Sequence, residues 1–181
     1  MKAGLPYVWG ATDEEIAAGY GCDSVLPAPG EALLRAVTVG APATVVYRWL
    51  CQLKIAPYSY DLLDNFGRRS PRILTPGAER LEIGQPVMTI FKLVGFSADE
   101  ELTLRMHVPS AVRLFGDLAV SYRLFDNAPA SCRLVAKLVL DGRPGLLADL
   151  RRQALAWGDL LMMRKQLNTL RQLAETSYGT I

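Results

Sequence analysis

The chemistry open to this sequence is limited first by its histidine and cysteine content. It contains a single histidine, His107, and three cysteines, Cys22, Cys51 and Cys132, which are widely separated and form no CxxC pair. A metal centre needs several nitrogen, sulfur or carboxylate ligands at short, regular spacing. No such spacing occurs here, so the sequence predicts no metal site.

Nucleophilic catalysis and nucleotide binding also lack their usual motifs. A Ser-His-Asp or Cys-His site would need His107 as its base, and no GxSxG motif is present to hold a serine nucleophile. The glycines on either side of Tyr20 do not follow a strand, as a dinucleotide-binding loop does, and no Walker motif occurs. We therefore predict no catalytic residue and no cofactor.

Polar side chains gather in one segment, residues 58–72, where they could recognise a ligand. Asp61 and Asp64 lie three residues apart and share a face if the segment is helical. They could form structural ion pairs with Arg68 or Arg72, or they could bind the polar end of a ligand. Both alternatives stay open, and the candidate ligand-binding residues of this segment are Tyr58, Tyr60, Asp61 and Arg72.

The composition indicates one globular domain with no affinity for nucleic acid. Of 181 residues, half are apolar and the formal net charge is only +2. No apolar run approaches the ~18 residues of a membrane-spanning helix. Pro6, Gly10 and Asp13 interrupt any apolar signal segment, and an odd number of separated cysteines argues against a secreted disulfide framework. We expect a cytoplasmic protein.

Helical signals come first along the chain. Residues 1–30 are rich in glycine and proline and are expected to form an N-terminal arm, in which Thr12 and Glu15 predict a capped short helix over 13–20. Residues 31–39 are predicted to form a strand. A helix then begins at Pro42 and continues through Leu53, and a second short helix ends at Gly67.

The remainder alternates like a sheet and ends in one long helix. Strands are predicted over 71–74, 79–82, 86–95, 101–107, 116–125 and 131–140. From residue 146 to about 176 the apolar spacing is helical, which corresponds to roughly 45 Å of helix.

The last two predicted strands have one apolar and one charged face. Their apolar face should contact the long helix, and the face carrying Arg123, Arg133 and Lys137 should contact water. A wall with almost no titratable groups, in which Tyr122 is the main polar side chain, favours binding over acid–base catalysis. The candidate lining residues are Phe91, Leu104, Met106, Val120, Tyr122, Leu134 and Ala136 from the strands, with Trp157 and Leu161 from the helix.

Three stretches, 35–42 with the following Trp49, 58–72 and 157–167, resemble the START-like helix-grip superfamily, also called SRPBCC. The middle stretch looks like an uncharacterised bacterial subgroup. The resemblance covers residues 31–176 and implies an α+β helix-grip domain over 31–181. In that fold a curved antiparallel sheet wraps around a long C-terminal helix, and two short helices follow the first strand. It also implies a cavity between sheet and helix, which this superfamily uses for lipids, sterols, polyketides or plant hormones.

Three functions are compatible with these observations, together with a packed core that has no cavity. The leading hypothesis is binding of a hydrophobic small molecule. The second is a polyketide cyclase or aromatase, in which Tyr122, Tyr60 and Asp61 orient a reactive polyketide. The third is an interaction module whose arm packs on a second copy to form a homodimer.

Overall fold

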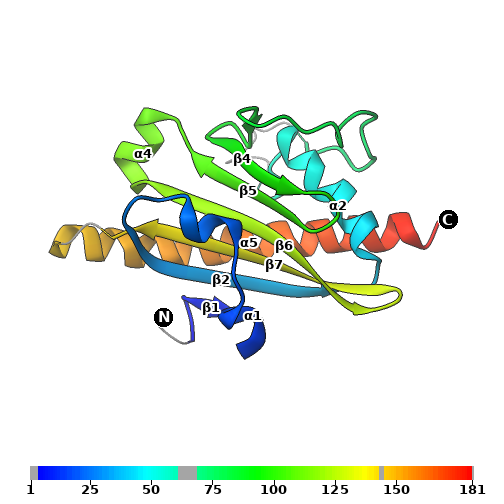
Figure 1. Ribbon diagram of the computed structural model, residues 1–181, viewed down its shortest axis with the longest axis horizontal. Coiled ribbons are helices and arrows are strands. Elements are labelled where there is room, and N and C mark those ends of the chain that lie inside the picture. The colour runs from blue at the N-terminus through cyan, green and yellow to red at the C-terminus, as the bar shows by residue number, and fades with distance from the viewer. Residues whose placement is uncertain (1–3, 61–68, 143–144, 181) are drawn as a thin grey trace.

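The computed structural model describes residues 4–60, 69–142 and 145–180, and these form one curved sheet with a long helix on its concave face (Figure 1). The seven strands run in the order β1-β2-β7-β6-β5-β4-β3. Only β1 and β2 pair in parallel within the described sheet. The strands are β1 (Val8–Trp9), β2 (Pro29–Val39), β3 (Pro86–Val87), β4 (Phe91–Ser97), β5 (Glu101–Met106), β6 (Leu118–Ala128) and β7 (Ser131–Asp141).

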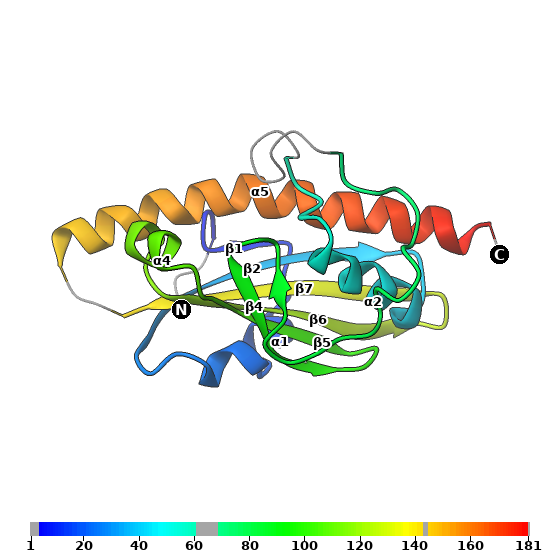
Figure 2. The same cartoon turned by 90° about the horizontal axis from the view of Figure 1, so that it is seen from above.

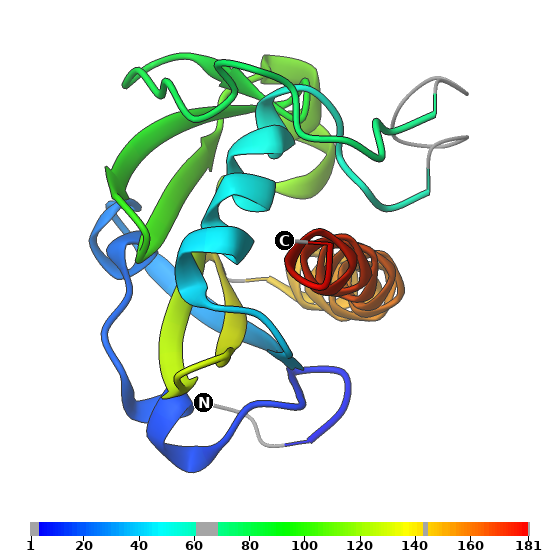
Figure 3. The ribbon, with the colours of Figure 1, turned by 90° about the vertical axis from the view of Figure 1, so that its right-hand side faces the viewer.

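Helices occupy both faces of this sheet, but very unequally. The long helix α5 crosses the concave face beside α2, and the N-terminal arm lies behind the sheet (Figures 2 and 3). This arrangement confirms the predicted α+β helix-grip architecture. The helices are α1 (Asp13–Ala17), α2 (Ala43–Cys51), α4 (Pro109–Phe115) and α5 (Leu146–Tyr178), with 3-10 turns η1 (Gly21–Ser24) and η2 (Gln52–Lys54).

Strand alternation builds the main core on the face that the period of two predicts. In β6 and β7, every second side chain lies in one hydrophobic cluster with the inner face of α5. On α5 the buried positions Ala156, Leu160, Met163, Leu167 and Leu170 recur at helical spacing. The central strands and the helix therefore hold each other through apolar burial, the dominant favourable term in folding.

The N-terminal arm packs on the convex face of its own sheet. Tyr20, Cys22 and Leu26 form a second, smaller core with outward-facing residues of β2, β6 and β7. The arm approaches β5 closely at Gly21, where an added Cβ atom would lie 2.3 Å from the Thr103 hydroxyl oxygen. The predicted capping box is confirmed, since Thr12 accepts from the Glu15 amide and Glu15 accepts from the Thr12 amide.

This packing corrects the expectation that the charged face of the last two strands meets water. Lys137 is buried and forms an ion pair of 2.7 Å with Asp23 of the arm. Arg133 donates to Glu15, with Nε and Oε1 separated by 2.7 Å. The sequence shows alternation but not what covers each face, so an arm that brings carboxylates to the strands could not be anticipated.

Leu26→Ala is expected to lower the free energy of unfolding by about 2–4 kcal/mol, because it empties a buried position between arm and sheet. Leu5→Ala is the matched control, since Leu5 lies in the same arm with 55% of its surface exposed and should change stability by less than about 0.5 kcal/mol. Urea unfolding of both variants checks this. Equal effects would contradict the packing of the arm.

Several predicted boundaries between α2 and β5 are wrong. Residues 71–74 and 79–82 are not strands, and the strand predicted over 86–95 is two strands, β3 and β4. The chain turns between them at Met88 and Thr89, both with positive φ, which alternation of residue types does not reveal. Helix α4 was not predicted, and the second short helix predicted after α2 falls mostly on residues outside those described.

Candidate functional site

The concave face of the sheet brings most of the predicted lining residues together. Leu104, Val120 and Leu134 come from three neighbouring strands and are almost fully buried in the apolar cluster that also contains residues of α2 and α5. They belong to one continuous apolar cluster, so the predicted wall exists as a surface of contacting side chains. The other predicted residues in this cluster are Met106, Tyr122, Ala136 and Tyr58, and Phe91 packs against its edge.

Other predicted residues lie elsewhere. Trp157 and Leu161 are 48% and 59% exposed on the side of α5 that faces away from the sheet, which corrects their expected place between sheet and helix. Tyr60 is 43% exposed and Arg72 is exposed, whereas Asp61 lies outside the described residues. The apolar residues at helical spacing in 146–176 cover more of the helix surface than the sheet does. Their spacing alone therefore does not show which of them point toward the sheet.

A buried polar connection joins Tyr122 of β6 to α5. The Tyr122 hydroxyl donates to Gln166 Oε1 at 2.7 Å, and Gln166 Nε2 donates to the Pro57 carbonyl at 2.6 Å. The same Nε2 lies 3.3 Å from the sulfur of Met88, which is half-buried. This polar pair therefore reaches from the middle of the sheet to the loop between η2 and β4, where the core meets the surface.

A second buried connection, which sequence reasoning missed, holds α5 to β2 of the sheet. Arg35 of β2 is 0% exposed, and its Nη2 forms an ion pair of 2.9 Å with Asp159 of α5. Its guanidinium also donates to the backbone carbonyls of Tyr7, Leu34 and Ala156. One side chain thus joins the first strand of the arm, the sheet and the long helix.

Ala136 makes room for these two connections. In the register of the sheet, Arg35 pairs with Ala136 and Ala136 pairs with Tyr122, so the three lie in one row across β2, β7 and β6. The small central side chain separates two large polar ones on the face below α5. The sequence did contain a signal for Arg35. Arg35 lies between Leu33 and Val37 at a spacing of two, so all three side chains lie on the same, buried face of β2.

Burial dominates the protonation of these groups. It raises the pKa of Asp159 to about 6, against the opposing effect of Arg35. Burial, and to a lesser extent the charge of Asp159, raises the pKa of Tyr122 well above its ordinary value. Burial also raises the pKa of Cys22 and Cys132 to about 11 and of Cys51 to about 12, which keeps these thiols protonated and weakly nucleophilic.

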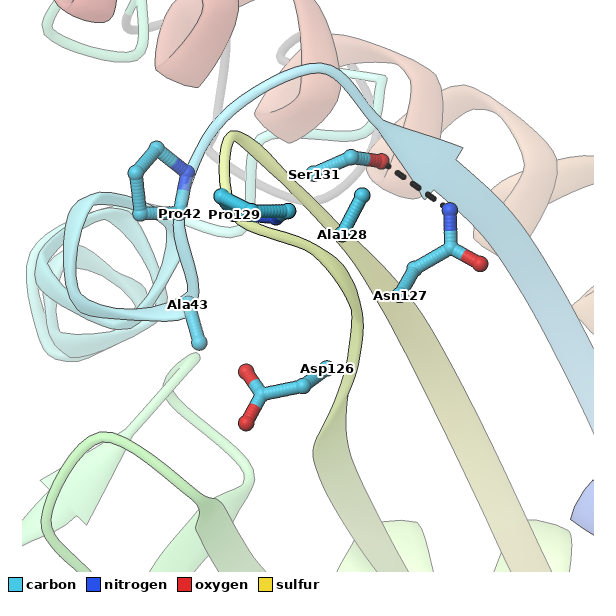
Figure 4. A pocket seen from close by; sticks show the side chains of 7 residues that line it. All are labelled: Pro42, Ala43, Asp126, Asn127, Ala128, Pro129 and Ser131. Atoms are coloured by element: carbon cyan, nitrogen blue, oxygen red, sulfur yellow. Dashed lines mark hydrogen bonds between the residues drawn. The ribbon is translucent and has the colours of Figure 1, made fainter.

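An open surface hollow of about 430 Å³ lies away from this face, between the start of α2 and the β6–β7 turn (Figure 4). Asp126 and Asn127 in it are exposed, and Asn127 Nδ2 lies 3.3 Å from Ser131 Oγ. Sites for small molecules bury most of the ligand surface, which a hollow with mostly exposed walls does not do. Its lining residues are Pro42, Ala43, Asp126, Asn127, Ala128, Pro129 and Ser131.

Metal ligation and membrane spanning find no support in the described residues. Within residues 4–60, 69–142 and 145–180, no three His, Cys, Asp or Glu side chains are placed to hold a metal ion. His107 sits at the end of β5, exposed, with Nδ1 3.2 Å from the Ile90 carbonyl. No helix in the same part of the chain has the length and apolar character needed to cross a bilayer.

Comparison with solved structures decides the fold. The di-domain ARO/CYC StfQ from the steffimycin biosynthetic pathway superposes with a TM-score of 0.53 at 14% identity, over 82% of this chain and 51% of StfQ. The chain has the helix-grip fold. Protein MLL2253 of Mesorhizobium loti gives a TM-score of 0.52 at 12% identity, over 81% of this chain and 98% of MLL2253.

A further helix-grip neighbour is a Thermobifida fusca protein solved by NMR, with a TM-score of 0.52 at 19% identity over 82% of this chain and 93% of the other. Identities this low show the common fold alone. No family model matches the sequence. No curated protein matches it either.

Proposed function

We propose that this helix-grip domain binds a hydrophobic small molecule, a lipid, sterol or polyketide-like compound, between the concave face of the sheet and α5. The observation that carries the proposal is the apolar face of β5, β6 and β7 with the Tyr122–Gln166 pair set into it. Apolar walls with few convergent polar groups are the usual design of small-molecule sites. StfQ, which has this fold, belongs to a biosynthetic pathway and is an ARO/CYC.

The ligand's polar end is assigned to Tyr122 and Gln166. Both side chains offer a donor and an acceptor, and they are buried where an unpaired polar atom of the ligand would otherwise be costly. The apolar remainder would lie along Leu104, Val120 and Leu134. The polar pair would orient one end of the ligand, and the three apolar residues would supply dispersion contacts along its length.

Room for the ligand comes from methionine side chains beside the polar pair. Met163 Sδ lies 3.9 Å from the Tyr122 hydroxyl, and Met88 touches Gln166 from the loop side. Unbranched thioether side chains change rotamer at little cost and adapt to irregular occupants. Because Met88 is half-buried and contacts Gln166, we place the entry of the ligand beside this methionine.

Tyr122→Phe is expected to weaken binding about fivefold, because the ligand loses one hydroxyl partner worth about 1 kcal/mol. A panel of a long-chain fatty acid, a sterol and a polycyclic aromatic polyketide, screened by thermal shift and native mass spectrometry, first identifies the probe. Isothermal titration with that probe then compares the wild type with the variant.

Tyr20→Phe is the matched control for this titration. It removes another buried tyrosine hydroxyl, which donates to the Glu15 carbonyl at 2.7 Å, but on the opposite face of the sheet. It should leave affinity unchanged. If both variants weaken binding equally, or if no compound of the panel binds the wild type, the assignment of this face fails.

A further inference from the structure

An apolar stripe runs along the outer face of α5, where no other element of the described residues covers it. Leu150, Ala154, Trp157 and Leu161 are exposed at intervals of four, three and four residues, so they line one side of the helix. Leu150 is 64% exposed and Leu161 is 59% exposed. We refer to these four residues as the α5 stripe. Their side chains contribute little to the core, so folding alone does not account for three large apolar residues in a row.

The exposed charges that follow the α5 stripe are basic, whereas the exposed Asp149 just before it is ion-paired with Arg152. The exposed Arg164 and Lys165 follow it directly on the helix. All three acidic residues of α5 have a partner within the protein. Asp149 pairs with Arg152, Asp159 is held beneath the helix by Arg35, and Glu175 accepts from the Gly40 amide.

These two features disfavour a second copy of the chain as the occupant. A stable protein–protein interface buries about 800 Å² on each partner, more than one narrow helical stripe with a single tryptophan supplies. Two copies would also bring their basic groups together without acidic partners on this face. A surface with anionic groups outside and apolar groups beneath would match both the apolar stripe and the basic residues beside it.

We propose that the outer face of α5 docks on the surface of an anionic lipid bilayer, with Leu150, Trp157 and Leu161 entering the interfacial region. Arg164 and Lys165 then contact the lipid phosphates. Tryptophan and leucine on one side with basic residues beside them are typical of helices that lie in the membrane interface. This proposal is independent of any ligand on the concave face, because the two surfaces lie on opposite sides of α5.

The test is co-sedimentation of the full chain with vesicles of phosphatidylcholine alone and of equal parts phosphatidylcholine and phosphatidylglycerol. We expect binding to the mixed vesicles, weakened by raised salt because exposed charges are screened. The double variant Trp157→Ser/Leu161→Ser should bind at least tenfold more weakly. Lys165→Gln should bind about fivefold more weakly, since each basic residue near the surface contributes about one such factor.

Two controls distinguish vesicle binding through the α5 stripe from nonspecific adsorption of exposed apolar side chains. Ile83→Ser removes an apolar side chain that is 62% exposed on a loop and should leave vesicle binding unchanged. Trp157→Phe should retain binding but reduce the blue shift of tryptophan fluorescence that vesicles cause. Trp49 is buried, but Trp9 is half-buried beside Arg164 and can contribute to the shift. The part of the shift that Trp157→Phe removes is therefore the part due to Trp157.

Three outcomes overturn the proposal: no binding to the mixed vesicles, equal binding of the wild type and the double variant, or equal loss with Ile83→Ser. Light scattering identifies the competing occupant. A wild type that is dimeric without lipid, and becomes monomeric in the double variant, would assign the α5 stripe to a second copy instead.

Discussion

Arg35→Met is expected to lower the free energy of unfolding by about 3–5 kcal/mol at pH 8, the effect of removing one partner from a buried ion pair. The substitution leaves the Asp159 carboxylate without its cation and removes the donor to the carbonyls of Tyr7 and Ala156. Urea unfolding followed by circular dichroism measures the loss.

Arg105→Met is the matched control, because it breaks an ion pair at a more exposed position. Arg105 Nη2 lies 2.6 Å from Asp117, but the Arg105 side chain is 34% exposed. Such pairs contribute at most about 1 kcal/mol. Adding Asp159→Asn to Arg35→Met should recover much of the loss, because no buried charge then remains. A double variant as unstable as Arg35→Met would contradict this explanation.

The deficit of Arg35→Met should shrink as the pH falls. Burial raises the pKa of Asp159 to about 6 from an ordinary value of 3.8, so the folded state binds this proton more tightly than the unfolded state. The stability associated with that proton is complete below about pH 4 and is lost as the pH rises through about 6. Loss of Arg35 raises this pKa further, so the deficit at pH 5 should be clearly smaller than at pH 8. A constant deficit would show that the lost hydrogen bonds, and not the charge, dominate.

Leu167→Ala should destabilise the protein by about 2–5 kcal/mol, because it leaves a cavity where α5 meets the sheet and the residue is 0% exposed. Leu161→Ala, six residues earlier on the same helix, should change stability by less than about 0.5 kcal/mol, since Leu161 is mostly exposed. Thermal and urea unfolding distinguish the two. Similar losses would mean that α5 is rotated about its axis relative to the sheet.

This pair of leucines shows what the sequence can and cannot specify. Periodicity predicted α5 and the alternation of β6 and β7, because these patterns depend only on the geometry of helix and strand. The helical apolar spacing from residue 146 to about 176 includes both Leu161 and Leu167, although only Leu167 is buried. How much of a helix is covered depends on tertiary packing, which no local pattern records.

Long-range partners were the other unpredictable part of the candidate site. Tyr122 was recognised as the polar group of the apolar wall, but its partner Gln166 comes from a helix 44 residues later. Arg35 and Asp159 are separated by more than a hundred residues and meet only because α5 packs across β2. The local sequence pattern around each of these residues does not reveal its partner. The residues form a site only when the fold brings them together.

Methyl-resolved NMR with the best compound of the ligand panel tests the central claim most directly. If the ligand lies between the sheet and α5, its intermolecular contacts will fall on methyl groups of Leu104, Val120 and Leu134. Those of Leu34 and Val139, on the convex face, will be unaffected. Contacts confined to the convex face or to the hollow beside Asp126, or a panel without any bound compound, would contradict the proposed function.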